Sequence, residues 1–95
     1  MFLSIDAGNS NIVFGLFDNA SSPWSHELRV ETSKAISPFE LQRELQLFLL
    51  ENDLTPAAVN HIGFSSVVPE LERPVVDFCR SFFGKGALYH QWEKL

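Results

Sequence analysis

Three segments near the amino terminus carry the hydrophobic pattern of β-strands. Residues 2–5 and 12–17 are continuous apolar runs, which is typical of strands buried on both faces at the centre of a sheet. Residues 24–30 instead alternate apolar and polar side chains, as a half-exposed strand does. Polar turns over 6–11 and 18–23 separate the three segments, so the pattern predicts an antiparallel meander.

Beyond residue 30 the spacing of apolar positions changes from a period of two to a period of 3.6. A helix is predicted over 38–52, because Ser37 is suited to cap its first turn and Pro38 is suited to its first position. The elements predicted after it are a strand, a helix and a strand, over residues 61–68, 71–83 and 86–92.

The order of these elements, βββαβαβ, predicts an α/β domain with a mixed five-stranded sheet. Strands four and five are expected to run parallel to the first, because each follows a helical crossover. No repeat, low-complexity segment or linker divides the 95 residues, so residues 1–95 are predicted to form one domain.

Composition narrows the class of protein. A hydrophobic content of 45% with nine phenylalanines predicts a packed core. The net charge of −5, with its few basic residues scattered, argues against a nucleic-acid or anionic membrane surface. Cys79 has no partner for a disulfide and falls on the apolar face of the second helix, which predicts a buried thiol. With no signal peptide and no long apolar run, the sequence predicts a cytoplasmic protein.

The segment from Asp6 to Asn11 carries the clearest chemical signal. Gly8 leaves room for backbone N–H groups to approach an anion, and the Asn and Ser side chains add neutral donors. Asp6 would repel a phosphate unless a cation lay between them, so it is a candidate ligand of Mg²⁺ or of a metal-bound water. The same residues are equally typical of a hairpin turn capped by Asp6 and Asn9, and their spacing leaves both interpretations open.

Other polar residues carry weaker signals. Ser65 and Ser66 end the fourth predicted strand and are candidates for facing the same cleft, but capping of the backbone explains them equally well. His26, His61 and His90 lie on different elements without the spacing of metal ligands, which predicts structural roles.

Two motifs resemble those of a known family. Residues 5–18, Ile-Asp-Ala-Gly-Asn-Ser-Asn-Ile-Val-Phe-Gly-Leu-Phe-Asp, are similar to the amino terminus of type III pantothenate kinases. Residues 65–69, Ser-Ser-Val-Val-Pro, resemble that family's second amino-terminal motif, and residues 78–84 resemble the helix after it. Ser10 stands where the family usually has Thr, which keeps the hydroxyl. The resemblance covers nearly all of the chain.

The resemblance implies a ribonuclease H-like half-domain of the actin-like ATPase superfamily, which also contains acetate kinases, sugar kinases and Hsp70. The implied activity is ATP-dependent phosphorylation of pantothenate to 4'-phosphopantothenate, the first step of coenzyme A biosynthesis. Mg²⁺ and a monovalent cation, K⁺ or NH₄⁺, are the implied cofactors, and a homodimer is the implied full-length form. The implied ATP-binding residues are Asp6, Ala7, Gly8, Asn9, Ser10, Asn11, Ile12 and Val13.

One motif of that family is missing from the sequence. Gly-x-Asp-Arg, which supplies the family's catalytic base and a contact to pantothenate, does not occur. The catalytic residues are therefore expected beyond Leu95, in a second, catalytic and dimerisation domain. The isolated chain is expected to be inactive, because phosphoryl transfer depends on positioning both substrates. The alternative is a non-catalytic nucleotide-binding regulatory or accessory protein of the same superfamily.

Overall fold

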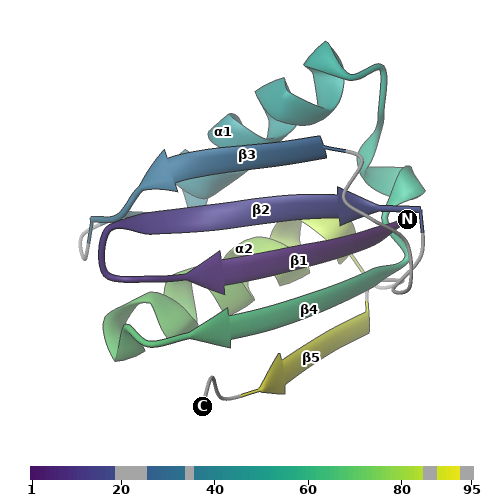
Figure 1. Cartoon of the computed structure of the whole chain (residues 1–95). Coiled ribbons are helices and arrows are strands. Elements are labelled where there is room, and N and C mark those ends of the chain that lie inside the picture. The colour runs from purple at the N-terminus through teal and green to yellow at the C-terminus, as the bar shows by residue number, and fades with distance from the viewer. Residues whose placement is uncertain (19–25, 34–35, 85–87, 93–95) are drawn as a thin grey trace.

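The chain folds into a mixed β-sheet with the strand order β3-β2-β1-β4-β5 and two α-helices (Figure 1). The computed structural model describes residues 1–18, 26–33, 36–84 and the backbone of 88–92. The strands are β1 (Phe2–Ala7), β2 (Asn11–Phe17), β3 (His26–Glu31), β4 (His61–Ser66) and β5 (Leu88–Trp92). The helices are α1 (Pro38–Glu51) and α2 (Glu72–Phe83), with short 3₁₀ turns at Pro56–Ala58 and Pro69–Leu71.

Strand β1 lies inside the sheet, hydrogen-bonded along both edges. It pairs antiparallel with β2 and parallel with β4, while β3 pairs antiparallel with β2 and β5 pairs parallel with β4. The register places Asp6 between Val13 of β2 and Ser65 of β4. The predicted α/β class with a mixed sheet is confirmed, including the meander and the parallel return after α1.

The first hairpin is tighter than the sequence pattern predicts. Strand β1 continues to Ala7 and β2 already begins at Asn11, so only Gly8–Ser10 lie between them. The Gly8 N–H donates to the Asn11 carbonyl at 2.9 Å and thereby extends the pairing to the base of the loop. The expected turn over 6–11 is therefore wrong at both ends. Polar Asp6 and Asn11 fit strand positions because one side of the sheet is not closed by the helices.

Local capping explains the start of α1 and the end of α2. The Ser37 side chain accepts a hydrogen bond from the Glu40 N–H at 3.1 Å, and α1 begins at the next residue, Pro38. Helix α2 begins at Glu72, one residue later than predicted, after a 3₁₀ turn. It ends at Phe83, and the next residue, Gly84, has a φ of 72°, in the left-handed region that glycine tolerates without a steric penalty.

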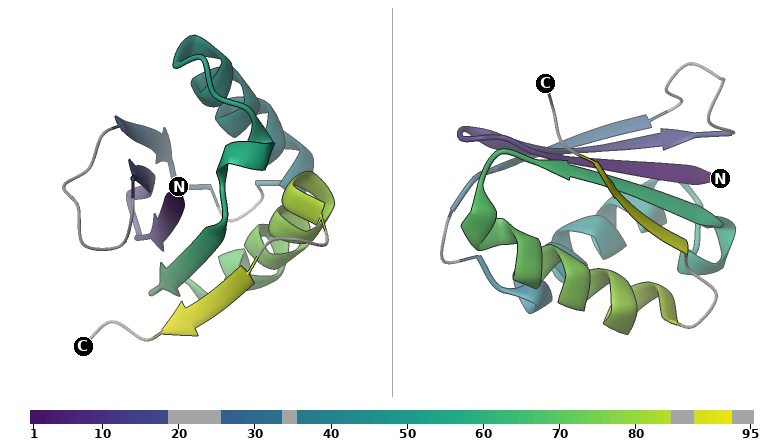
Figure 2. Two further views of the ribbon diagram at one scale, coloured as in Figure 1. Left: turned by 90° about the vertical axis from the view of Figure 1, so that its right-hand side faces the viewer. Right: turned by 90° about the horizontal axis from the view of Figure 1, so that it is seen from below.

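Both helices cover the same face of the sheet (Figure 2). Along β1, Leu3, Ile5 and Ala7 are fully buried beneath them, whereas Phe2, Ser4 and Asp6 on the opposite face are partly exposed. The expectation that β1 is buried on both faces is therefore wrong for the described residues. Its apolar run has another cause on the helix-free face, where the Phe2 ring packs edge-on against Phe17 of β2 at a centroid distance of 5.9 Å.

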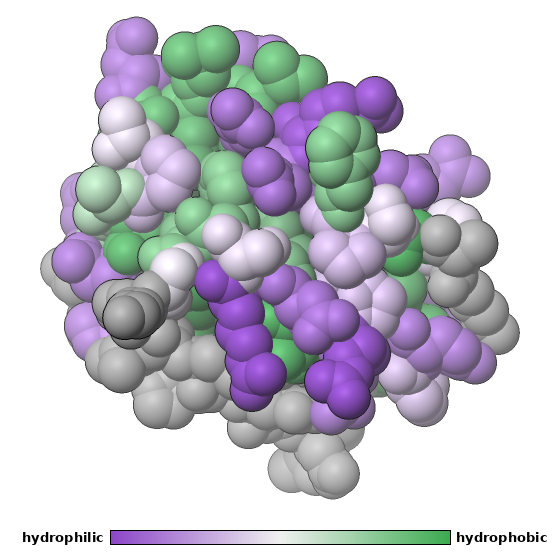
Figure 3. All heavy atoms as spheres, turned by 180° about the vertical axis from the view of Figure 1, so that it is seen from behind, coloured by the Kyte–Doolittle hydropathy of each residue, from purple (hydrophilic) through white to green (hydrophobic). Residues whose placement is uncertain are grey.

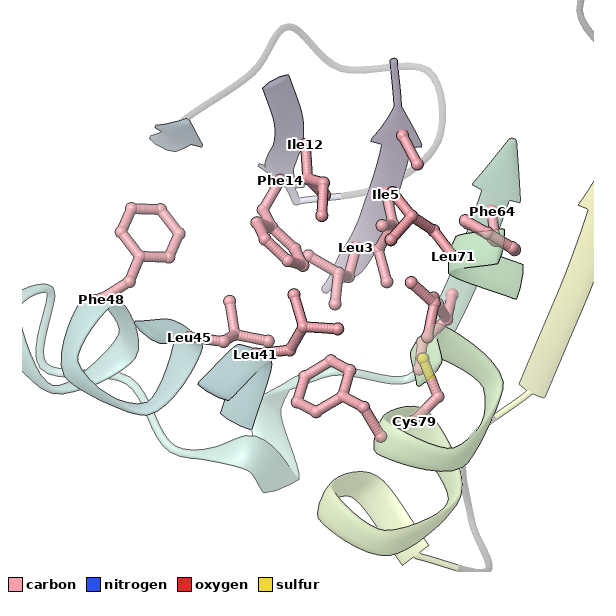
Figure 4. Packing of buried hydrophobic residues seen from close by; sticks show 14 of the residues in the cluster. Leu3, Ile5, Ile12, Phe14, Leu41, Leu45, Phe48, Phe64, Leu71 and Cys79 are labelled. Carbon is pink, nitrogen blue, oxygen red and sulfur yellow. The ribbon is translucent and has the colours of Figure 1, made fainter. Parts of the chain in front are cut away.

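The core lies between the sheet and the helices (Figure 4). Ile5 and Phe14 from the strands point toward Leu41 and Leu45 of α1, and Cys79 of α2 closes the cluster from the side of β4. Each fully buried side chain of this size contributes about 1.5–3 kcal/mol relative to an exposed one. This one-sided core holds the sheet and leaves the carboxyl ends of β1 and β4 available for other contacts.

The outer surface of the helices is mixed in polarity (Figure 3). Hydrophobic residues reach this surface among charged ones, and the large exposed ones on α1 are Phe39, Leu47 and Leu50. None of the helices in the described residues has the length and apolar character needed to cross a membrane.

Cys79 is expected to resist alkylation while the chain is folded. Its side chain is buried, and this burial raises the pKa of the thiol from 9.0 to about 12, because the thiolate would lose its hydration. The thiolate is the nucleophile, so little reactive species is present between pH 7 and 9. Iodoacetamide followed by mass spectrometry should give slow labelling in native buffer and rapid labelling in guanidinium chloride. Equal rates in the two solvents would contradict the burial.

Candidate functional site

The candidate site lies at the carboxyl ends of the parallel strands β1 and β4, where the loop Gly8–Ser10 leaves the sheet (Figure 1). Ligands in open α/β sheets commonly bind at this edge, beyond the carboxyl ends of the strands. Asn9 and Ser10 at the loop tip are exposed, whereas Gly8 is partly covered. The loop therefore offers side-chain amide, hydroxyl and backbone groups at a place that solutes can reach.

Asp6 and Ser65 form a polar pair next to this loop. They lie opposite each other in the parallel ladder, and the Ser65 hydroxyl donates to Asp6 Oδ1 at 3.3 Å. Ser65 is only 2% exposed, while Asp6 is partly exposed. The buried hydroxyl thus contacts a carboxylate that solvent can still reach.

Ser66 has a different role from its neighbour. Its hydroxyl oxygen accepts the Val68 N–H at 2.9 Å and lies 2.9 Å from the Val68 carbonyl, to which it donates. This local turn ends β4 two residues earlier than predicted. Of the two serines expected at a cleft, the structure directs Ser65 to Asp6 and uses Ser66 to cap the backbone.

The remaining residues of the implied ATP-binding segment divide between core and site. Ala7 and Ile12 are fully buried toward the helices, so their side chains belong to the core. Val13 lies opposite Asp6 on β2 and is partly exposed, and Asn11 begins the same strand. The side chains that the structure gathers at the loop are thus those of Asp6, Asn9 and Ser10.

Thr32 contacts this loop, although no feature of the sequence singled it out. It follows β3 directly, and its N–H donates to the Ser10 carbonyl at 2.9 Å. Its Oγ1 donates to the Gly8 carbonyl at 2.8 Å. The available signal was the alternation of β3, because continuing that strand past residue 30 pairs Thr32 with the loop.

A metal at this site would rely on one carboxylate. No group of three or more His, Cys, Asp or Glu side chains able to hold a metal occurs within the described residues. Mg²⁺ in phosphate-binding sites commonly uses one or two carboxylates, water and the phosphates of its substrate. A single accessible Asp6 carboxylate fits that donor set.

His26 has a structural contact, since its ring packs against Phe48 at a centroid distance of 6.5 Å, and the His90 side chain lies outside the described residues.

A family model and the similar sequences carry the same description. A family model described as type III pantothenate kinase matches residues 2–94. A protein of that description from Elusimicrobium minutum is 32% identical over 85 residues, covering 88% of this chain and 32% of the relative. One from Rhodospirillum centenum is 35% identical over 86 residues, covering 88% of this chain and 31% of the relative. The chain spans about a third of the length of these relatives.

A solved structure resembles the fold. The putative N-acetylglucosamine kinase of Porphyromonas gingivalis superimposes with a TM-score of 0.61 at 13% sequence identity. The superposition covers 96% of this chain and 34% of the neighbour. At this level of identity the likeness concerns the fold alone.

Proposed function

Because the chain belongs to the type III pantothenate kinase family, we propose that it supplies the ATP phosphate-binding part of an enzyme that converts pantothenate to 4'-phosphopantothenate. This reaction is the first step of coenzyme A biosynthesis. The observation that carries the proposal is the position of the Gly8–Ser10 loop. It leaves the sheet at the carboxyl ends of β1 and β4, inside the matched residues, with an accessible Asp6 carboxylate next to it.

The proposed chemistry transfers the γ-phosphoryl group of ATP to the primary hydroxyl of pantothenate. The hydroxyl oxygen forms a bond to phosphorus, the bond to ADP breaks, and a base outside this chain accepts the hydroxyl proton. Such reactions depend on positioning and on neutralising phosphate charge. The loop supports this role because its polar groups are accessible, and Asp6 would hold Mg²⁺ against the phosphates. Bound Mg²⁺ would supply the charge neutralisation.

The further properties implied by the resemblance belong to the same proposal. They are a ribonuclease H-like half-domain of the actin-like ATPases, a monovalent cation (K⁺ or NH₄⁺), a homodimeric complete protein and a cytoplasmic location. The sugar kinase neighbour supports the fold assignment. Nucleotide binding without phosphoryl transfer in the complete protein would instead favour the accessory role.

Asp6→Asn is expected to remove most of the Mg²⁺-dependent activity of a protein that contains this chain and has the full length of its relatives. The loss should be at least about tenfold in kcat/KM, because a neutral amide binds the metal weakly. Stability should change little, since an amide oxygen still accepts the Ser65 hydrogen bond. A coupled assay of ADP release measures the activity. The control is Asp53→Asn, at an exposed residue after α1. Full turnover in Asp6→Asn would refute the metal role.

Gly8→Ala and Gly84→Ala are expected to separate binding from stability. A Cβ at Gly8 would lie 3.4 Å from the Asn11 oxygen, an ordinary contact, and Gly8 lacks a left-handed φ. Gly8→Ala should therefore change the free energy of unfolding little. It should nevertheless weaken MgATP binding, because the added Cβ would block the close approach of a phosphate group. Gly84→Ala should cost about 1 kcal/mol of stability because of its positive φ and leave binding unchanged. Thermal unfolding measures the stability of the two variants, and calorimetric titration with MgATP measures their affinity for the nucleotide. Unaltered binding in Gly8→Ala would contradict the proposed approach of phosphate.

A further inference from the structure

Thr32 fastens the candidate phosphate loop from the end of β3. Its backbone N–H and its hydroxyl donate to the Ser10 and Gly8 carbonyls, at 2.9 Å and 2.8 Å. One residue thereby holds two carbonyls of the loop, one on each side of Asn9. The loop is the part of the chain between β1 and β2, whereas Thr32 comes directly after the third strand, β3.

The register of the sheet shows on which face of the sheet the Thr32 hydroxyl lies. Glu31 pairs with Asn11, and the hydrogen bond from Thr32 to Ser10 continues this ladder by one residue. Because side chains alternate along a strand, Thr32 lies on the same side as Val30, which packs against the core beneath the helices. Asp6 lies on the opposite, helix-free side, since its neighbours Ile5 and Ala7 are the buried ones.

The Thr32 hydroxyl therefore fixes the direction of one peptide group in the loop. A trans peptide is planar, with its carbonyl and its N–H pointing in opposite directions. The Gly8 carbonyl points toward Thr32, so the N–H of Asn9, which shares that peptide group, points away from it. Thr32 lies on the helix side of the sheet and Asp6 on the helix-free side, so an N–H directed away from Thr32 is also directed away from the helix-covered face.

We propose that Thr32 is a positioning residue, which holds the Asn9 N–H as a donor to a phosphate group of ATP beside Asp6. The inference rests on the proposed function, because it concerns the same nucleotide. Without the hydroxyl, the Gly8–Asn9 peptide can rotate, and its N–H is no longer preorganised for the anion. Thr32 itself does not contact the phosphate.

The test is a titration of the 95-residue chain with MgATP, followed by amide ¹H–¹⁵N NMR. In the wild type the Asn9 amide is expected to show one of the largest shifts. Thr32→Val keeps the branched shape and the backbone N–H but removes the hydroxyl donor, and should raise the dissociation constant about tenfold. Thr32→Ser restores the hydroxyl and should bind within about twofold of the wild type.

Thr55→Val is the matched control. Thr55 is exposed before a 3₁₀ turn and makes no side-chain capping hydrogen bond there, so this change should leave the dissociation constant unaltered. A merely structural role of the Thr32 hydroxyl would lower the melting temperature of Thr32→Val without weakening MgATP binding by the folded variant.

The outcomes separate this inference from the proposed function. Wild-type affinity in folded Thr32→Val would overturn the role of Thr32 and leave nucleotide binding intact. No binding of MgATP to the loop of the wild type would overturn the proposed function itself, and the role of Thr32 with it. If Thr32→Val does not fold, the wild-type titration decides, because MgATP shifts that leave the Asn9 amide unaffected would refute the inferred donor.

Discussion

The pairing of β1 along both of its edges is the constraint on which the rest of the structure depends. An antiparallel neighbour on one edge and a parallel neighbour on the other bring residues from distant parts of the sequence into one row, in which Asp6 lies between Val13 and Ser65. A shift of one residue in the pairing of β1 with β2 or with β4 would turn the side chains of β1 to the other face relative to that neighbour. The polar pair of Asp6 and Ser65 therefore exists only in this register.

The one-sided placement of the helices gives β1 two different environments. Leu3, Ile5 and Ala7 contribute to the core, and the alternate positions remain partly exposed. A carboxylate at a fully enclosed position would have to lose its hydration, which is costly without a partner charge. Asp6 avoids this cost, because it is accessible and accepts a hydrogen bond from Ser65. Core and candidate site thus share one strand.

Much of this fold could be predicted from the sequence, because strong local signals mark its elements. The Ser37 cap, the apolar stripe of α1 and the glycine after α2 each indicate an element or one of its ends. The limits of the strands were less predictable, since Asp6 and Asn11 have the composition of a turn but hydrogen-bond as strand residues. The burial of β1 was overestimated, because apolar runs do not distinguish a covered face from a pair such as Phe2 and Phe17.

The candidate site was predictable where its residues are contiguous in sequence. The loop from Asp6 to Asn11 could be recognised as a motif, but Thr32 enters through the register of β3, and its contact with the loop follows only when the alternation of that strand is continued past residue 30. This contact also has a consequence for changes in chain length. Deleting one residue near the start of β3 would bring Ser33 opposite Ser10 and Glu31 opposite Ile12, so that a charged side chain would take the core-facing position of Val30. A change in the length of this edge strand should therefore be tolerated less readily than a substitution, because it changes every pairing between the deletion and the loop.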